Sequence, residues 1–231
     1  MTAKTAKKIP SKPAAAVPLA PTQPVYYNRR PWYIAMLIVG VLLLAASLAL
    51  VLTGRLDDLE LKIFTVVNHA NLPDWVANQL AKPLSNAVYG MVALVVVLLA
   101  FPKYRLLSWQ YVVAIGSAYV SAFVIAELVG RARPLGLAGY EAIARATQGG
   151  PGYPSGHVAV ITALGLTIWP LVSWPWRVFI LLLISAEAWS RVFLGVHAPL
   201  DVVGGCAVGL TVVALIHLTP AKIRRFFKIS A

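Results

Sequence analysis

The stretch WYIAMLIVGVLLLAASLALVLT, residues 32–53, decides the fold class, because it carries no charged side chain along its whole length. An α-helix rises about 1.5 Å per residue, so roughly 20 apolar residues cross the hydrocarbon core of a bilayer. This run therefore predicts a membrane-spanning helix, and its place near the N-terminus predicts that it acts as a signal anchor.

Further apolar runs follow this stretch, and they predict an all-α, polytopic membrane protein with about six transmembrane helices. These runs are Ala87–Phe101, Leu107–Val129, Val158–Trp174, Val178–Trp189 and Val202–Leu218. Some are shorter than a full span of about 20 residues, so flanking residues must extend them. The composition agrees, since apolar residues make up 59% and charged residues 12% of the chain. Soluble domains carry about a quarter charged residues.

The segments between and around these runs complete the predicted organisation. Leu56–Lys82 carries Leu59, Ile63 and Val66 at helical spacing, which predicts short interfacial helices. Residues 1–31 are basic, lack acids and have a Pro/Ala-rich centre, so we expect a disordered tail. Residues 32–219 form the predicted membrane domain, and residues 220–231 a second basic tail. Gly205 and Gly209 in the last run have the spacing of close helix packing.

The formal charge of +12 is explained by the orientation in the membrane. With six spans and the N-terminus inside, the inner segments hold thirteen of the twenty Lys and Arg residues and no acidic residue. We therefore expect both termini in the cytoplasm of a bacterium, with the protein in its inner (plasma) membrane. Anionic lipid of the inner leaflet accounts for the basic residues, so a nucleic-acid partner is not needed. The single cysteine, Cys206, provides neither a disulfide framework nor a metal cluster.

Three clusters of polar residues lie at the predicted outer ends of the later spans. They are Arg131–Pro134, Pro154–His157, and Ser190 and Arg191 together with His197–Asp201. Arginine presents a fixed fork of donors that matches phosphate oxygens. Ser155 and Gly156 precede an apolar helix, so their backbone N–H groups could hold an anion. The clusters therefore predict phosphate chemistry at the periplasmic or exterior face.

Two histidines and one carboxylate supply the groups that this chemistry needs. His197 and Asp201 stand four residues apart, so a helical turn would place the carboxylate beside the imidazole. An aspartate that holds one ring nitrogen makes the other a better nucleophile or base. His157 is suited to protonate a leaving alkoxide.

These motifs resemble the signatures of the type 2 phosphatidic acid phosphatase superfamily. Residues 154–157, Pro-Ser-Gly-His, resemble its second signature. Ser190-Arg191, then five residues and His197, then three residues and Asp201, resemble the third. Arg133-Pro134 resembles the end of the first, Lys-(six residues)-Arg-Pro.

The resemblance implies hydrolysis of a lipid phosphate through a phosphohistidine, with neither metal nor cofactor. By analogy His197 is the nucleophile, Asp201 orients it and His157 is the general acid. The residues that would bind the phosphate are Arg133, Ser155, Gly156 and Arg191. We expect a polyprenyl (pyro)phosphate such as undecaprenyl pyrophosphate as the substrate, with glycerolipid phosphates such as phosphatidylglycerol phosphate second.

One departure from the family pattern keeps alternatives open. Where the first signature has lysine, this chain has Ala126, followed by Glu127. Arg131 could supply the missing phosphate-binding charge, or it could pair with Glu127 four residues earlier. A phosphotransferase that uses the same intermediate, and a catalytically silent relative that binds phospholipid, are the alternative functions. The oligomeric state is left open.

Overall fold

A computed structural model of the chain describes residues 30–98, 100–101 and 105–219. These residues form helices and no strand, which confirms the all-α prediction. The predicted basic tails at 1–31 and 220–231 lie outside the described residues, except that Arg30 and Pro31 begin the first helix. The helices are α1 (Arg30–Thr53), α2 (Asp57–Asn68), the π-helical segment η2 (Val76–Ala81), α3 (Lys82–Leu98), α4 (Arg105–Val129), α5 (Gly156–Ile168), α6 (Trp174–Phe193) and α7 (Pro199–Leu218), with short 3-10 turns η3 (Pro134–Gly136) and η4 (Trp169–Leu171).

Three helical stretches in the described part of the chain are long and apolar enough to cross a membrane. They are Arg30–Thr53, Trp109–Gly136 and Pro199–Leu218, and the apolar stretch Gly156–Leu171 is shorter. Their outward faces keep large apolar side chains exposed, such as Leu42 and Leu128, as expected of a surface that meets lipid. The chain is therefore an integral membrane protein, and the count of six spans remains a prediction.

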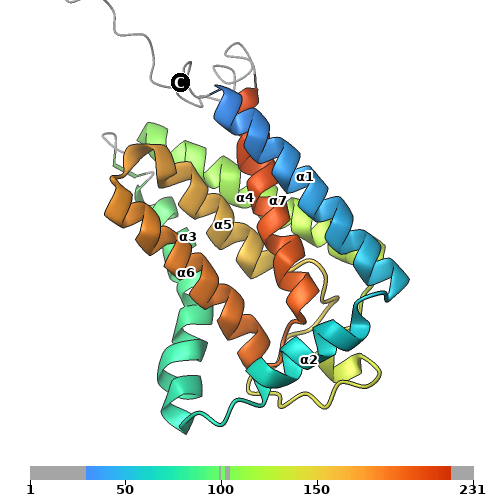
Figure 1. Cartoon of the computed structure of the whole chain (residues 1–231). Helices are drawn as coiled ribbons and strands as arrows, with labels where there is room; N and C mark the ends of the chain where they lie inside the picture. The colour runs from blue at the N-terminus through green and yellow to red at the C-terminus, as the bar shows by residue number, and fades with distance from the viewer. Residues whose placement is uncertain (1–29, 99, 102–104, 220–231) are drawn as a thin grey trace, which may run out of the picture.

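Helix α7 lies at the centre of the bundle and packs against α1, α4 and α5 (Figure 1). Glycines make this packing close. A Cβ added at Gly205 would lie 2.5 Å from the carbonyl oxygen of Ser155, and one at Gly209 would lie 2.6 Å from Cβ of Thr162. The close helix packing that the glycine spacing predicts is therefore confirmed, and the structure identifies α5 as the partner.

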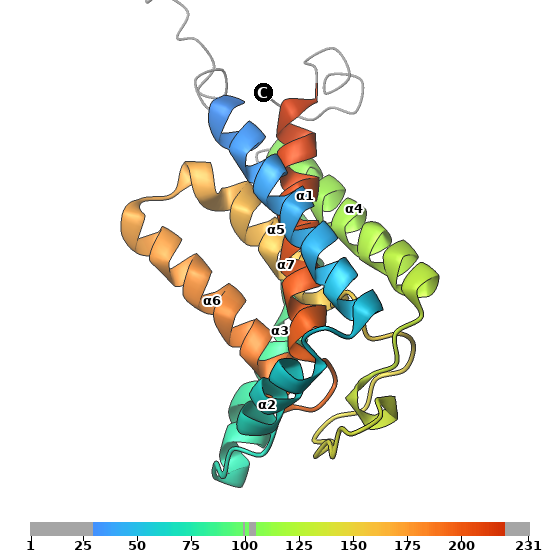
Figure 2. The ribbon, with the colours of Figure 1, turned by 45° about the vertical axis from the view of Figure 1, so that its right-hand side comes forward.

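The helix ends that carry the polar motifs meet at one end of the bundle. Helices α1, α4 and α6 end there, and α3, α5 and α7 begin there (Figures 1 and 2). Helix α2 lies at this end and packs against α6 and α7. The start of α1 and the end of α7 lie together at the opposite end. The loops between 130 and 155 and between 193 and 199 are thereby brought to α2.

Helix α2 presents an apolar face outward and a partly polar face inward. Leu59, Ile63 and Val66 are exposed, with 74% of Val66 accessible. Glu60 and Asn68 are buried, although both are polar. The predicted amphipathic helix is confirmed as a helix. Its buried polar residues lie beside the loops that carry the motifs, which makes α2 part of the site.

Candidate active site

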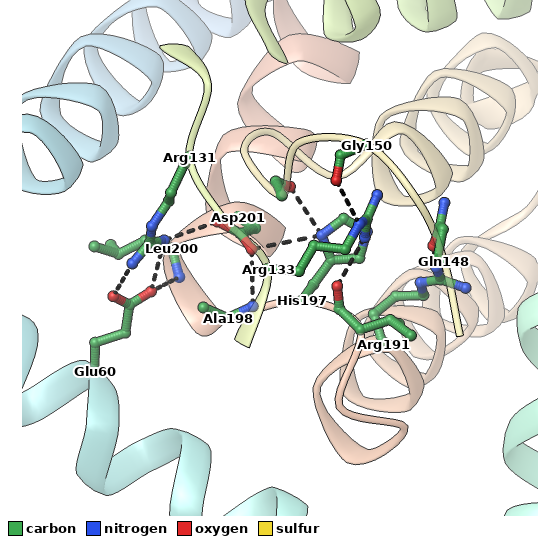
Figure 3. Close-up of polar contacts among 12 residues, drawn as sticks. Glu60, Arg131, Arg133, Gln148, Gly150, Arg191, His197, Ala198, Leu200 and Asp201 are labelled. Carbon is green, nitrogen blue, oxygen red and sulfur yellow. Dashed lines mark hydrogen bonds and ion pairs between the residues drawn. The ribbon is translucent and has the colours of Figure 1, made fainter. Parts of the chain in front are cut away.

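His197 and Asp201 meet at the start of α7, as Figure 3 shows. Nδ1 of His197 lies 3.5 Å from Oδ2 of Asp201, and both side chains are almost completely buried. The predicted proximity is confirmed, but its geometric reason is different. His197 lies before the helix, and Asp201 in the first helical turn accepts a hydrogen bond from the N–H of Ala198 at 2.8 Å. The pair is joined through a helix N-terminus instead of a continuous helical turn.

The partners of His197 determine which nitrogen carries its proton. Nδ1 lies 2.9 Å from the carbonyl oxygen of Gly152, which can only accept, so Nδ1 donates. Nε2 lies 3.1 Å from Nη1 of Arg133, which can only donate, so Nε2 holds a lone pair. Burial lowers the pKa of His197 to about 4, with the charges of Arg191 and Arg133 adding to burial and Asp201 opposing it. The ring is therefore neutral at physiological pH.

Two arginines, Arg133 and Arg191, lie on the side of His197 that faces away from Asp201 (Figure 3). Arg133 donates from Nε to the carbonyl of Gly150 at 3.0 Å and from Nη1 to the carbonyl of Val196 at 2.7 Å. Arg191 is 4% exposed, and its Nη2 donates to Oε1 of Gln148. Arg133 lies against the unprotonated nitrogen of His197, and the charge of Arg191 also acts on this ring, so the positive charge at this place favours an anionic group.

The start of α5 contributes a buried hydroxyl, and here one expectation needs correction. The backbone N–H of Ser155 does not face the site, because it donates to the carbonyl oxygen of Asp201 at 2.8 Å. Its Oγ is fully buried and has no hydrogen-bond partner among the described residues. Of these two groups of Ser155, the N–H is therefore engaged within the fold, whereas the hydroxyl keeps its hydrogen-bonding capacity.

Gly156 and His157 form the first turn of α5. A Cβ added at Gly156 would meet only the ring of Tyr119, at 4.0 Å, so the space beside this residue is open. The imidazole of His157 lies edge-on to Tyr89, with ring centroids 5.1 Å apart, and Arg191 and His197 are among its electrostatic neighbours. The second imidazole is thus brought to the same site as the first.

Arg131 takes a place that neither sequence-based interpretation predicts. Its Nη1 donates to Oδ1 of Asp201 at 2.7 Å and to Oε1 of Glu60 at 3.1 Å, and its Nη2 donates to Oε2 of Glu60 at 2.5 Å. Glu127 takes part in none of the ion pairs described in the structure. A guanidinium held between two carboxylates is poorly placed to bind a phosphate, because both carboxylates repel that anion. We therefore leave Arg131 out of the phosphate-binding set.

Sequence reasoning missed three residues that contact the motifs: Glu60, Gln148 and Gly152. The signal for Glu60 is that it stands four residues before Phe64 and eight before Asn68, on one face of α2. Gly152 ends a glycine-rich segment directly before the second motif, which is typical of close backbone approach. Gln148 had no signal. The structure describes no cluster of three or more His, Cys, Asp or Glu side chains that could hold a metal ion.

A family model described as the PAP2 superfamily matches residues 107–225, just over half of the chain. The chain belongs to the PAP2 superfamily. The matched residues include every candidate site residue from Arg131 to Asp201. The protein is therefore a phosphatase, a hydrolase of phosphoric esters, from a family of membrane lipid phosphatases.

Similar proteins agree with this assignment. The chain is 26% identical over 186 residues to an undecaprenyl-diphosphatase of Sulfolobus acidocaldarius, which covers 78% of this chain and 87% of that one. It is 30% identical over 165 residues to the putative undecaprenyl-diphosphatase YbjG of Escherichia coli, which covers 67% and 79%.

Two crystal structures share the fold. Aquifex aeolicus LpxE gives a TM-score of 0.59 at 21% identity, over 68% of this chain and 93% of that one. A PAP2-type phosphatidylglycerolphosphate phosphatase of Bacillus subtilis gives 0.63 at 18% identity, over 79% and 92%. At these identities the likeness concerns the fold alone.

Proposed function

We propose that this phosphatase removes the terminal phosphate of a polyprenyl pyrophosphate through a phosphohistidine at His197. The observation that carries the proposal is the tautomer of the neutral His197 ring, in which Nδ1 carries the proton and Nε2 the lone pair. Its Nδ1–H is held by the carbonyl of Gly152, while the lone pair of Nε2 is directed toward Arg133. The substrate class is supported by the names of two relatives, an undecaprenyl-diphosphatase and a putative undecaprenyl-diphosphatase.

In the first step Nε2 of His197 attacks the terminal phosphorus. The N–P bond forms while the bond from phosphorus to the bridging oxygen breaks, and its electron pair stays on the departing lipid monophosphate. His157 protonates that oxygen. Arg133, Arg191 and the hydroxyl of Ser155 hold the non-bridging oxygens, whose charge they stabilise in the transition state.

In the second step water hydrolyses the phosphohistidine. His157, which has lost its proton, accepts one from the water as the new O–P bond forms. The N–P bond breaks, its electron pair returns to Nε2, and inorganic phosphate leaves. Asp201 offsets the positive charge that the ring of His197 carries while Nε2 is bonded to phosphorus.

Trapping the intermediate tests the proposal. Substrate labelled in its terminal phosphate should transfer the label to the protein in an acid-labile, alkali-stable bond, and His197→Ala should abolish both labelling and phosphate release. His217→Ala is the matched control, because His217 lies in the last turn of α7, at the opposite end of the bundle. A His197→Ala protein that still releases phosphate would refute the nucleophile. Faster turnover of a glycerolipid phosphate would refute the substrate class.

We also propose six spans, α1 and α3 to α7, with the site on the outer face and both termini in the cytoplasm. The support is that the predicted inner segments hold most basic residues, together with the alternating helix directions. In a Cys206→Ser background, Thr147→Cys should react with an impermeant thiol reagent in intact cells, and Lys103→Cys should react only after lysis. Thr147 is exposed in the loop that precedes the second motif. The reverse labelling pattern would invert the orientation.

A further inference from the structure

We propose that Glu60 on α2 is a positioning residue of the reaction, which acts on His197 through Arg131 and Asp201. The inference rests on the proposed function, because it gives Glu60 a part in forming the phosphohistidine. Glu60 lies outside the segment that matches the family model, which begins at residue 107. None of the signatures in the sequence includes it.

Glu60 is a buried acid that accepts hydrogen bonds from Arg131 and from the start of α7. It is 3% exposed, and its two oxygens accept hydrogen bonds from both terminal nitrogens of Arg131. Oε1 also accepts a hydrogen bond from the backbone N–H of Leu200 at 2.8 Å. Leu200 belongs to the first turn of α7. Figure 3 shows the side chains of Glu60, Arg131, Asp201 and His197 next to one another, in that order, across the site. A buried carboxylate is retained only where such partners offset the cost of its burial.

The charges of this group explain why a second carboxylate is useful. Asp201 alone would be neutralised by Arg131, which lies 2.7 Å from its Oδ1. With Glu60 present, Arg131 is shared between two carboxylates, so the three groups together keep one net negative charge. When Nε2 of His197 donates its lone pair to phosphorus, Nδ1 keeps its proton and the ring becomes positive. The net negative charge behind the ring stabilises that state more than the neutral resting state.

Glu60 also fixes the position of the carboxylate of Asp201, whose Oδ2 lies 3.5 Å from Nδ1 of His197. Leu200 directly precedes Asp201, so the hydrogen bond from Leu200 to Glu60 ties the first turn of α7 to α2. Asp201 then has its Oδ1 held by Arg131 and its Oδ2 held by Ala198. Glu60 therefore affects His197 in two ways, through the net charge beside the ring and through the position of Asp201, although it does not touch the substrate.

Kinetics of Glu60→Gln and Glu60→Asp test this role. Glu60→Gln keeps the size of the side chain and removes its charge, so kcat should fall by about tenfold to a hundredfold while KM stays within about twofold. Glu60→Asp keeps the charge and should recover part of the loss. Asp58→Asn is the matched control, because Asp58 is an exposed acid on the same helix, and it should leave kcat unchanged.

Comparison of two inhibitors separates positioning from a merely structural role. Vanadate mimics the pentacoordinate phosphorus bonded to Nε2, whereas inorganic phosphate binds without that bond. In Glu60→Gln the inhibition constant of vanadate should therefore rise by the same factor as kcat/KM falls, and that of phosphate should not change. Equal weakening of both inhibitors, or a kcat within twofold of the wild type, would overturn the inference.

If Glu60→Gln does not accumulate as folded protein, Glu60→Asp must show the same selective loss of vanadate binding, and an equal loss of both inhibitors would overturn the role. Labelling of the wild-type protein and its loss in His197→Ala decide the proposed function without any change at Glu60. If the phosphohistidine forms normally in the wild type and Glu60→Gln has a kcat within twofold of the wild type, this inference is wrong and the proposed function stands.

Discussion

Gly152→Ala tests the carbonyl that holds the proton of His197. A Cβ at this position would lie 3.0 Å from Oδ2 of Asp201 and 3.1 Å from the carbonyl oxygen of Ala132. Asp201 cannot yield, because Arg131 holds one of its oxygens and a backbone N–H holds the other. We therefore expect the backbone at 152 to move by a few tenths of an ångström, which lengthens its 2.9 Å hydrogen bond to Nδ1.

The size of the effect follows from what that hydrogen bond does. A neutral hydrogen bond contributes about 0.5–1.5 kcal/mol, and one to a charged group about 1.5–3 kcal/mol. The bond to Nδ1 becomes of the second kind when the ring carries positive charge, so kcat/KM should fall by about tenfold or more. The assay is release of inorganic phosphate from a polyprenyl pyrophosphate in detergent. The thermal midpoint is measured beside it to confirm that the protein is folded.

Gly149→Ala is the control, because it makes the same change in the same loop with nothing within 4 Å of the added Cβ. It should keep kcat/KM within about twofold of the wild type, since surface changes of this kind cost little. If Gly152→Ala is as active as Gly149→Ala, the carbonyl of Gly152 does not hold the nucleophile in its reactive form. A loss of activity that merely follows a loss of folded protein would also refute the reasoning.

The remaining predictions concern the carboxylate, pH and packing. Asp201→Asn should lower kcat by about tenfold to a hundredfold in single-turnover phosphate release, since the charge that offsets the cationic ring is lost. The pKa of His197 is lowered by burial from 6.5 to about 4, so the unfolded state binds more protons between these values. Stability should therefore fall as pH drops through this window, by at most about 3 kcal/mol, and thermal unfolding of His197→Gln should lack this component. Gly205→Ala should lower the free energy of unfolding by about 1–3 kcal/mol, because its Cβ would meet the Ser155 carbonyl at 2.5 Å. Gly90→Ala, with open space around it, should not.

The membrane helices and the chemical motifs could be predicted because both are local in the sequence. A helix that crosses the hydrocarbon core needs a long apolar run, so the runs in the sequence predict the bounds of α1 and α7 to within two or three residues. The motifs mark helix ends, and the alternation of helices brings those ends to one side. The protonation of His197 could not be predicted, because it depends on the carbonyl of Gly152, forty-five residues earlier.

The role of α2 shows the limit of pattern reasoning. The spacing of Leu59 and Ile63 predicts an apolar stripe but says nothing of what the opposite face touches. That face carries Glu60, whose partners Arg131 and Leu200 lie far along the chain. The partner of Arg131 could not be predicted for the same reason, since i,i+4 spacing offers Glu127, whereas Glu60 lies 71 residues earlier in the chain.

Ala126, which stands at the position of the family lysine, lies on a packed face of α4. Ala126 is 8% exposed and continues a row of buried alanines on α4, after Ala114, Ala118 and Ala122 at intervals of four residues. This face lets α4 approach its neighbours closely, whereas a lysine would need a path for its charge to the site. Arg131 does not replace that charge, because Glu60 and Asp201 already share it.

In the proposed mechanism the phosphate therefore meets the guanidinium groups of Arg133 and Arg191. Their two positive charges match the two negative charges of one terminal phosphate, so the site has no surplus cation for a second phosphate. The inner phosphate of a pyrophosphate substrate should accordingly lie outside the arginine pair, toward His157, where it leaves with the lipid.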